Sequence, residues 1–341
     1  VTDTPMTDKL HLTTQGQSSD DSSTATGTTT SSITQIVIGS PDVVIHKGYT
    51  NKSDTQTGVT DQTFTPGGAL TSSNIAGIGA SNASKFDGGD KVTVTIAVEN
   101  KGSSPNGAFD VGINDTIDTN LDPSKGSLKF YSGKNGTPIT SVEIFKNGAW
   151  TSVTVAGNEA EVFDALQSAN GIRFADSSAS GALAQGQSIN QATGEYVANG
   201  TGDNIIYVTY EATVKSSNTP GTTSTSAATL SNFSNKDAGQ NILTSPRADS
   251  ASIGFNSNKI DLVITGTPDH SDTNVTAGGK TADAVVGEYV DYQLTINVSE
   301  ATTQNAEVVV NLGNGLGLVN VGGTTIEGGG FNAVSSGFGE S

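Results

Sequence analysis

Apolar and polar residues alternate in two stretches of this chain that begin 198 residues apart, and this alternation limits the fold more than any other feature. In the stretch 89–100 the apolar side chains occupy every second position: Val92, Val94, Ile96 and Val98. Successive side chains of a β-strand point to opposite faces, so the pattern predicts a strand with one face against a core and the other in water. The stretch 287–298 repeats it. We therefore expect successive β-rich repeats.

The boundaries of these repeats follow from further matches. Two more pairs of segments are similar in the same order: 41–45 with 260–264, and 108–113 with 306–310. Self-similarity at a long period indicates repeated structural units. We expect 1–38 to be closing strands of a preceding repeat, 39–255 a complete β-sandwich repeat, and 256–341 the opening strands of the next, incomplete one. Soluble proteins avoid long unpaired sheet edges, so either the natural chain continues or a neighbouring subunit supplies the missing strands.

The composition fits an acidic, all-β protein. The chain has 34 Asp and Glu against 16 Lys and Arg, a net charge of −18, which argues against nucleic-acid binding. The absence of cysteine excludes disulfides, thiolate metal sites and cysteine nucleophiles. Thr, Val and Ile favour strands, while the 42 glycines suit the turns between them. No apolar run approaches the roughly 20 residues of a transmembrane helix.

The middle of the chain contains recognisable local elements. Further strands are predicted at 128–131, 142–145, 172–174 and 205–214. Residues 146–149 predict a hairpin turn. Asn158 followed three residues later by Glu161 predicts the start of a helix of about eleven residues, with Val162, Phe163 and Leu166 on one face.

The sequence gives no support for an enzyme. The three histidines, His11, His46 and His270, lie far apart and none has the context of a catalytic triad. Gly-x-Ser-x-Gly, P-loop and dinucleotide-binding motifs are absent. Paired carboxylates for glycoside hydrolysis are not excluded, because their spacing is spatial. We therefore expect no catalytic residues and no organic cofactor.

Calcium is the best-supported ligand, because carboxylate, amide and carbonyl oxygens are the ligands that hard cations prefer. The candidate residues are Asp110, Asn114, Asp115, Asp118, Asn120, Asp122, Asp54, Asp87, Asp90, Asp269 and Asp272. Asp118, Asn120 and Asp122 alternate, but Pro123 and Lys129 stand where an EF-hand loop needs Gly and Glu. The alternative is that these acids occupy solvated turns.

Two other features deserve weighing. A Lys–Asn isopeptide bond would brace a cysteine-free domain, with Lys47 and Lys91 as conceivable donors, although the sequence identifies no partner. The aromatic residues Trp150, Tyr131 and Tyr207 are candidates for adhesion to glycans or proteins. The alternative, which we favour, is that these aromatic side chains pack the core.

Several of these segments resemble a known repeat. Pro41-Asp42 before a Val/Ile strand ending near Lys47, the run 89–102, and the run 108–121 are similar to a tandem immunoglobulin-like conserved repeat family, a domain of unknown function found in bacterial and archaeal cell-surface proteins. The resemblance covers about 33–121 and, more loosely, 249–318. It implies an all-β fold of tandem immunoglobulin-like β-sandwiches, with about 124–200 as a long insertion that carries the short helix.

The resemblance also implies a function. We expect a structural, extracellular segment of a cell-surface adhesin, envelope protein or filament, stiffened by calcium. Its expected partners are other copies of itself or neighbouring surface proteins, with glycans as a further option. The alternative is a secreted carbohydrate-binding module or part of an extracellular lytic enzyme.

Overall fold

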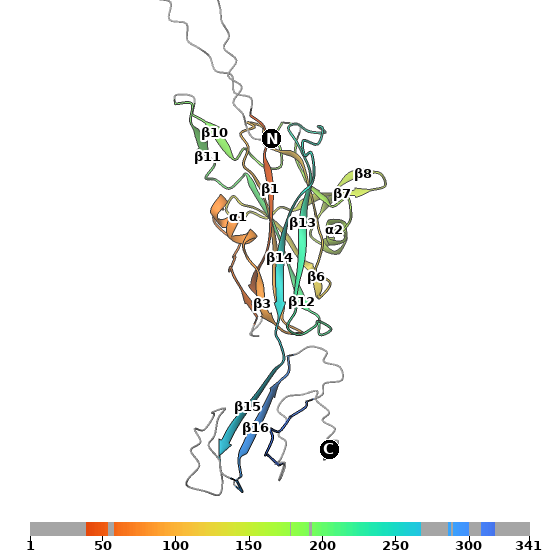
Figure 1. The fold of residues 1–341 in the computed structure, drawn as a ribbon. Helices are drawn as coiled ribbons and strands as arrows, with labels where there is room; N and C mark the ends of the chain where they lie inside the picture. Colours follow the sequence, from red (N-terminus) through yellow and green to blue (C-terminus); the bar gives the residue numbers. More distant parts are fainter. Residues whose placement is uncertain are drawn as a thin grey trace, which may run out of the picture. The chain divides into compact units, whose positions relative to one another are not determined.

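Two β-sheets face each other across one core in the computed structural model (Figure 1), which describes residues 39–53, 58–177, 179–190, 193–266, 286–287, 289–299 and 308–317. The first sheet has the order β1 (Val43–Lys52), β4 (Lys91–Asn100), β12 (Ile205–Val214), β6 (Leu121–Ser132). The second has the order β2 (Val59–Thr60), β3 (Ala83–Phe86), β14 (Arg247–Phe255), β13 (Thr223–Ser234), β5 (Phe109–Asp115), β9 (Ile172–Phe174), β7 (Ser141–Lys146), β8 (Ala149–Thr154). The expected all-β, immunoglobulin-like sandwich class is confirmed.

Two small hairpins and two short helices complete the described elements. The hairpins pair β10 (Gln187–Ile189) with β11 (Tyr196–Ala198), and β15 (Lys259–Gly266) with β16 (Asp291–Asn297). The helices are α1 (Ser72–Gly79) and α2 (Glu159–Leu166). Residues 308–317, part of a second compact unit at 304–341, contain no helix or strand. None of the described helices is both long and apolar enough to span a membrane.

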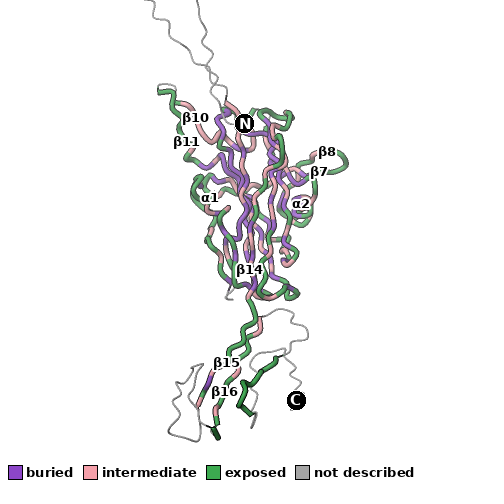
Figure 2. The backbone as a smooth tube through the Cα atoms, in the orientation of Figure 1, coloured by how far each residue is buried: buried purple, intermediate pink, exposed green. Residues whose placement is uncertain are grey.

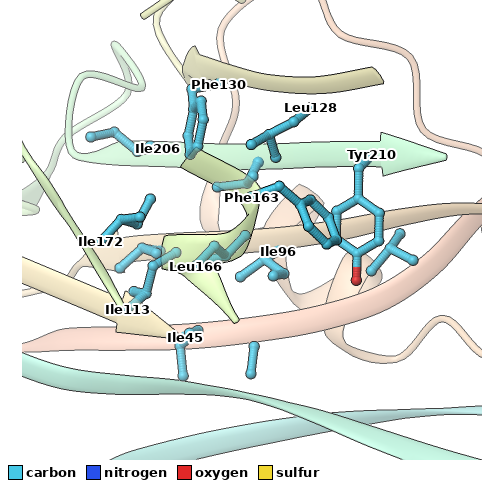
Figure 3. Close-up of a cluster of buried hydrophobic side chains, with 14 of the residues drawn as sticks. Ile45, Ile96, Ile113, Leu128, Phe130, Phe163, Leu166, Ile172, Ile206 and Tyr210 are labelled. Carbon is cyan, nitrogen blue, oxygen red and sulfur yellow. The ribbon is translucent and has the colours of Figure 1, made fainter. Parts of the chain in front are cut away.

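The core lies between the sheets, where the alternating apolar side chains of both meet. Figure 2 shows buried residues in purple along the strands of the sandwich. Figure 3 shows Phe163 and Leu166 of α2 inserted among aliphatic side chains from both sheets. The Phe163 and Tyr210 rings meet edge to face with centroids 5.0 Å apart, a favourable aromatic geometry. Helix α2 therefore closes one side of the sandwich rather than standing on its surface.

The local predictions for the middle of the chain are largely confirmed. The hairpin β7–β8 turns at Asn147 and Gly148, whose φ angles of 54° and 83° fit a type I′ turn. Asn158 is the N-cap of α2, and the expected face of α2 is buried. The helix has eight residues rather than about eleven, because the chain turns after Leu166 and Gly171 adopts a φ of 67°.

The prediction of a solvated face on the strand at 92–98 was wrong. Strand β4 is central in its sheet, and Thr95, Ala97 and Glu99 on its second face are also buried. Helix α1, which the sequence pattern did not predict, covers that face. The small apolar cluster beneath it consists of Leu70, Ile75, Ile78, Ala97, Ile205 and Tyr207.

The first and last strands of the sandwich run in the same direction in facing sheets. Arg247, at the start of β14, donates to the carbonyl of Val43, at the start of β1. Two residues into β14, Asp249 accepts a hydrogen bond from the Lys47 amide in the middle of β1. The chain therefore enters β1 at the end of the sandwich where β14 begins, and leaves β14 at the opposite end.

The hairpin of β15 and β16 pairs the two segments that the sequence matches to β1 and β4. Both pairs are antiparallel, but Leu262 lies opposite Leu294, whereas the register of β1 and β4 would place it four residues later, opposite Val298. The division of the chain at 38 and 255 into successive repeats stays a prediction.

Candidate functional site

Two oppositely charged side chains lie in the core between the sheets. Lys47 occupies the same face of β1 as Val43, Ile45 and Tyr49, all of which are buried. Asp115 ends β5 in the facing sheet. The two side chains are 1% and 0% exposed, so the charged groups meet out of contact with water.

The contacts of this pair are short, and the two oxygens of the Asp115 carboxylate have different partners. Lys47 Nζ lies 2.5 Å from Asp115 Oδ1 and 3.0 Å from the carbonyl oxygen of Thr116. The other carboxylate oxygen, Oδ2, accepts hydrogen bonds from the Tyr210 hydroxyl at 2.6 Å and from Gln167 Nε2 at 3.3 Å. Each oxygen of Asp115 therefore has a separate role: Oδ1 faces the amine, and Oδ2 faces the two neutral donors.

A second buried carboxylate, Asp118, stands beside the pair. Its Oδ1 accepts hydrogen bonds from the backbone and side-chain amides of Asn120 at 2.8 and 3.1 Å. Its Oδ2 is buried and has no hydrogen-bond partner among the described residues. A buried carboxylate oxygen without a hydrogen-bond partner destabilises the folded state, so its presence calls for an explanation.

Burial dominates the electrostatics of the site. It lowers the pKa of Lys47 from its ordinary value, against the opposing effects of Asp115 and Asp118. Burial also raises the pKa of Tyr210 well above its ordinary value, and the charge of Asp115 adds to the effect. Tyr210 therefore stays a hydrogen-bond donor, while the ammonium form of Lys47 is disfavoured.

The pair escaped the sequence analysis, although part of it leaves a signal. The sequence offers Lys47 as a conceivable donor of a Lys–Asn isopeptide bond and Asp115 as a calcium candidate, but it does not pair the two residues. Both occupy the apolar phase of their strands, Lys47 with Val43 and Ile45, and Asp115 with Val111 and Ile113. A charge at such a position marks a buried ionic site. Lys91, the other lysine considered, is exposed.

The acidic cluster expected around β5 divides into separate places. Asp110 and Asp115 lie at opposite ends of the strand, about 17 Å apart from the rise per residue. Asp110 binds Arg173 and accepts hydrogen bonds from the Ser234 hydroxyl and the Gly239 amide. Asn114 and Asn120 are half-buried and Asp122 is exposed. Asn120 meets Asp118 as a hydrogen-bond donor, through its backbone and side-chain amides, and not through an oxygen that could bind calcium.

The other calcium candidates lie elsewhere. Asp87 and Asp90 share the turn before β4, where the Asp87 amide donates to Asp90 Oδ2 at 2.8 Å. Asp54, Asp269 and Asp272 lie outside the described residues. Within the described part of the chain, no group of three or more acidic or histidine side chains converges as a metal site.

Calcium binding stays a prediction with a direct measurement. If calcium holds the acidic turns, chelation with EGTA removes a ligand of the native state, and the melting midpoint falls. Calorimetry of the full chain with and without EGTA measures this, with magnesium as the control cation. A midpoint that EGTA leaves unchanged contradicts calcium binding.

The aromatic candidates for adhesion are mostly occupied by internal contacts. Tyr207 is buried and stacks on Tyr131 with ring centroids 5.0 Å apart. Trp150 lies under the Arg173 guanidinium, 4.9 Å from its carbon. The expectation that these side chains pack the core therefore holds for Tyr207, in the small cluster under α1 with half-buried Tyr131 against it, whereas half-buried Trp150 belongs to neither apolar cluster of the described residues.

Of the three histidines, only His46 is described. Its Nδ1 lies 3.7 Å from an oxygen of Asp249. Burial alone would raise the pKa of Asp249, but hydrogen bonds from His46 and from the Lys47 and Ser250 amides outweigh it and hold the pKa below its usual range. The contact between His46 and Asp249 therefore joins β1 to β14.

Comparisons with known proteins add similarities of fold. No protein-family model matches the sequence, and a search of the curated proteins finds no match. Among solved structures, the chain is similar to BcpA, the major pilin subunit of Bacillus cereus, at 10% identity and a TM-score of 0.30, covering 76% of this chain and 56% of the pilin. The chain thus spans about half the length of that pilin.

Two further structures are similar at the same low level. The pilus backbone protein of Streptococcus pneumoniae has 12% identity and a TM-score of 0.27, covering 57% of this chain and 32% of that protein. The collagen-binding subdomain of the Enterococcus faecalis surface protein ACE has 10% identity and a TM-score of 0.20, covering 48% of this chain and 86% of the subdomain. No residue role follows from similarities of this size.

Proposed function

We propose that this chain is a structural segment of an extracellular surface filament or adhesin, and that its sandwich transmits tension along the chain. The observation that carries the proposal is the shared direction of β1 and β14 in facing sheets. Force applied through the chain pulls the start of β1 and the end of β14 in opposite directions, along the strands. In that geometry the backbone hydrogen bonds between β1 and β4 bear the force together rather than one after another.

Side chains from the start of β14 reinforce β1 near the end where the force enters it. Arg247 of β14 donates to the carboxylate of Asp42 at 2.7 Å and to the carbonyl of Val43. Lys47 of β1 donates its amide to Asp249 of β14 at 2.9 Å. These contacts cross from one sheet to the other, so sliding of β1 has to break them in addition to its own ladder.

The mechanical part of the proposal is tested by pulling in two directions. The chain has no cysteine, so engineered cysteines give unambiguous handles. Handles at Ser40→Cys and Asn258→Cys load the sandwich from its opposite ends. Handles at Ser40→Cys and Ser245→Cys pull from one end and peel the strands apart. We expect a higher unfolding force for the first pair in single-molecule force spectroscopy, and equal forces would overturn the proposal.

The location and partners are tested on the producing cells. We propose that other copies of this chain or neighbouring surface proteins are its partners. Immunogold electron microscopy with an antibody against the sandwich is expected to label filaments or a layer outside the cell. Label confined to the cell interior would contradict the proposal.

A further inference from the structure

We propose that Lys47 and Asp115 join covalently, through an amide bond between Lys47 Nζ and Asp115 Cγ, and that the sandwich catalyses this reaction on itself. The bond would connect the first strand of one sheet to the middle of the other. The inference rests on the geometry of the buried pair and not on the proposed function, and such a bond would take over tension that the β1–β4 hydrogen bonds bear in its absence. Four features of the site support it: contact, dryness, polarisation of the carboxyl group, and a nearby proton acceptor.

The reacting groups are in contact in a place without water. Nζ touches Oδ1 at 2.5 Å, so it is also adjacent to Cγ, the carbon it would attack. Holding the two groups together makes the reaction effectively unimolecular. The side chains are 1% and 0% exposed. Solvent water therefore does not reach the amide once it has formed, and its hydrolysis is suppressed.

The site favours uncharged forms of both partners. Two charges in a dry interior carry a desolvation cost, and transfer of one proton from Nζ to Oδ1 removes both charges at once. The lowered pKa of Lys47 agrees with such a transfer. The resulting neutral amine is a nucleophile, and the neutral carboxyl group has a hydroxyl that can leave as water.

Two donors polarise the carboxyl group on the side away from the amine. The Tyr210 hydroxyl lies 2.6 Å from Oδ2, and Gln167 Nε2 lies 3.3 Å from it. Negative charge develops on Oδ2 as Nζ attacks Cγ, and preorganised donors stabilise such a charge strongly in a dry site. Oδ2 therefore becomes the carbonyl oxygen of the product, and Oδ1 is the oxygen that leaves.

Atoms and protons balance without a further reagent. The ammonium group brings three protons to the carboxylate. The Cγ–Nζ bond forms, the Cγ–Oδ1 bond breaks, and Oδ1 departs as water with two of the protons. The third proton stays on the amide nitrogen, where the Thr116 carbonyl at 3.0 Å already accepts from Nζ.

Asp118 is suited to carry one of the two departing protons from Nζ to the leaving oxygen. Its charge acts on Lys47, and its buried Oδ2 has no donor among the described residues. A carboxylate in that state can take a proton from Nζ after attack and return it to the departing hydroxyl. The proposal thus explains an otherwise unsatisfied buried oxygen.

A matched pair elsewhere in the chain shows why contact alone is insufficient. Lys125 Nζ also lies 2.5 Å from a carboxylate oxygen, that of Asp164, but these side chains are 44% and 63% exposed. Both side chains of this pair are open to water, so the site lacks the dryness of the Lys47 site. We expect Lys125 and Asp164 to remain unlinked, which makes them an internal control.

Mass spectrometry of the folded full chain tests the bond. We expect an intact mass lower by one water than the sequence requires, and a branched peptide that joins the Lys47 segment to the Asp115 segment. The branched peptide is decisive, because cyclisation at Asp87-Gly88 would also lose one water. A linear Lys47 peptide and a linear Asp115 peptide from folded protein would overturn the inference.

Three variants separate chemistry from folding. Lys47→Arg keeps the positive charge but cannot form this amide, so we expect the full mass. Asp118→Asn keeps the shape of the side chain but removes the proton acceptor, so we expect linkage to slow by about 10²-fold in a chain that still folds. Asp118→Glu keeps a carboxylate and is expected to restore part of the rate, which a purely structural role of Asp118 would not predict. Linkage in Asp118→Asn at the wild-type rate would exclude its role as proton acceptor.

Discussion

Asp115→Ala is expected to destabilise the sandwich far more than Asp164→Ala, although each variant removes a carboxylate 2.5 Å from a lysine. In the first variant Lys47 is left in the core without a counter-charge, which costs about 3–5 kcal/mol. In the second, Lys125 turns to water, and the expected cost is about 0–1 kcal/mol. Because the two lysine–carboxylate distances are equal, the difference in stability between the two variants reports the effect of burial.

Thermal unfolding of the two variants measures the difference. For a unit of the size of the sandwich, the cost expected for Asp115→Ala lowers the melting midpoint by roughly 6–20 °C. Loss of the covalent bond would add to this value. The double variant Lys47→Met/Asp115→Leu is expected to recover much of the loss, because apolar side chains of similar size can replace a buried pair. Equal midpoints for Asp115→Ala and Asp164→Ala would show that the Lys47 site is not dry.

Several strands and turns of the sandwich could be predicted because the sequence patterns that specify them span only a few neighbouring residues. The alternation at 92–98, the turn at Asn147-Gly148 and the helical face of Val162, Phe163 and Leu166 depend on neighbours a few residues apart. The structure has these elements in the expected places. The same reasoning misjudged the second face of β4, because what covers that face is decided by α1, whose short and glycine-containing sequence has little helical signal.

The candidate site was much harder to predict, because its parts are distant in sequence. Lys47 and Asp115 are 68 residues apart, and Tyr210 lies 95 residues beyond Asp115. Each residue carries a local sign of burial, but only the order of the strands in the two sheets brings them together. Proximity in sequence instead grouped Asp110 with Asp115, and the extended strand between them keeps them apart. The strand period was informative, whereas clustering of like residues along the chain was misleading.

The proposed bond also predicts how far the sandwich extends under force. When the chain is pulled from positions before β1 and after β14, a bond between Lys47 and Asp115 carries the tension directly from one residue to the other. The segment between them then stays slack. Its 68 residue steps, at about 3.4 Å each, would remove about 230 Å from the unfolded length.

Single-molecule extension of the wild type and of Lys47→Arg measures this difference. We expect the variant to release about 230 Å more chain on unfolding. Lys125→Arg is the matched control, and its unfolded length should equal that of the wild type because the exposed pair is not linked. The length is set by covalent connectivity and not by stability, so a variant that only weakens the fold would unfold at lower force with an unchanged length. Equal lengths for wild type and Lys47→Arg would therefore refute the bond even if Lys47 proves essential for stability.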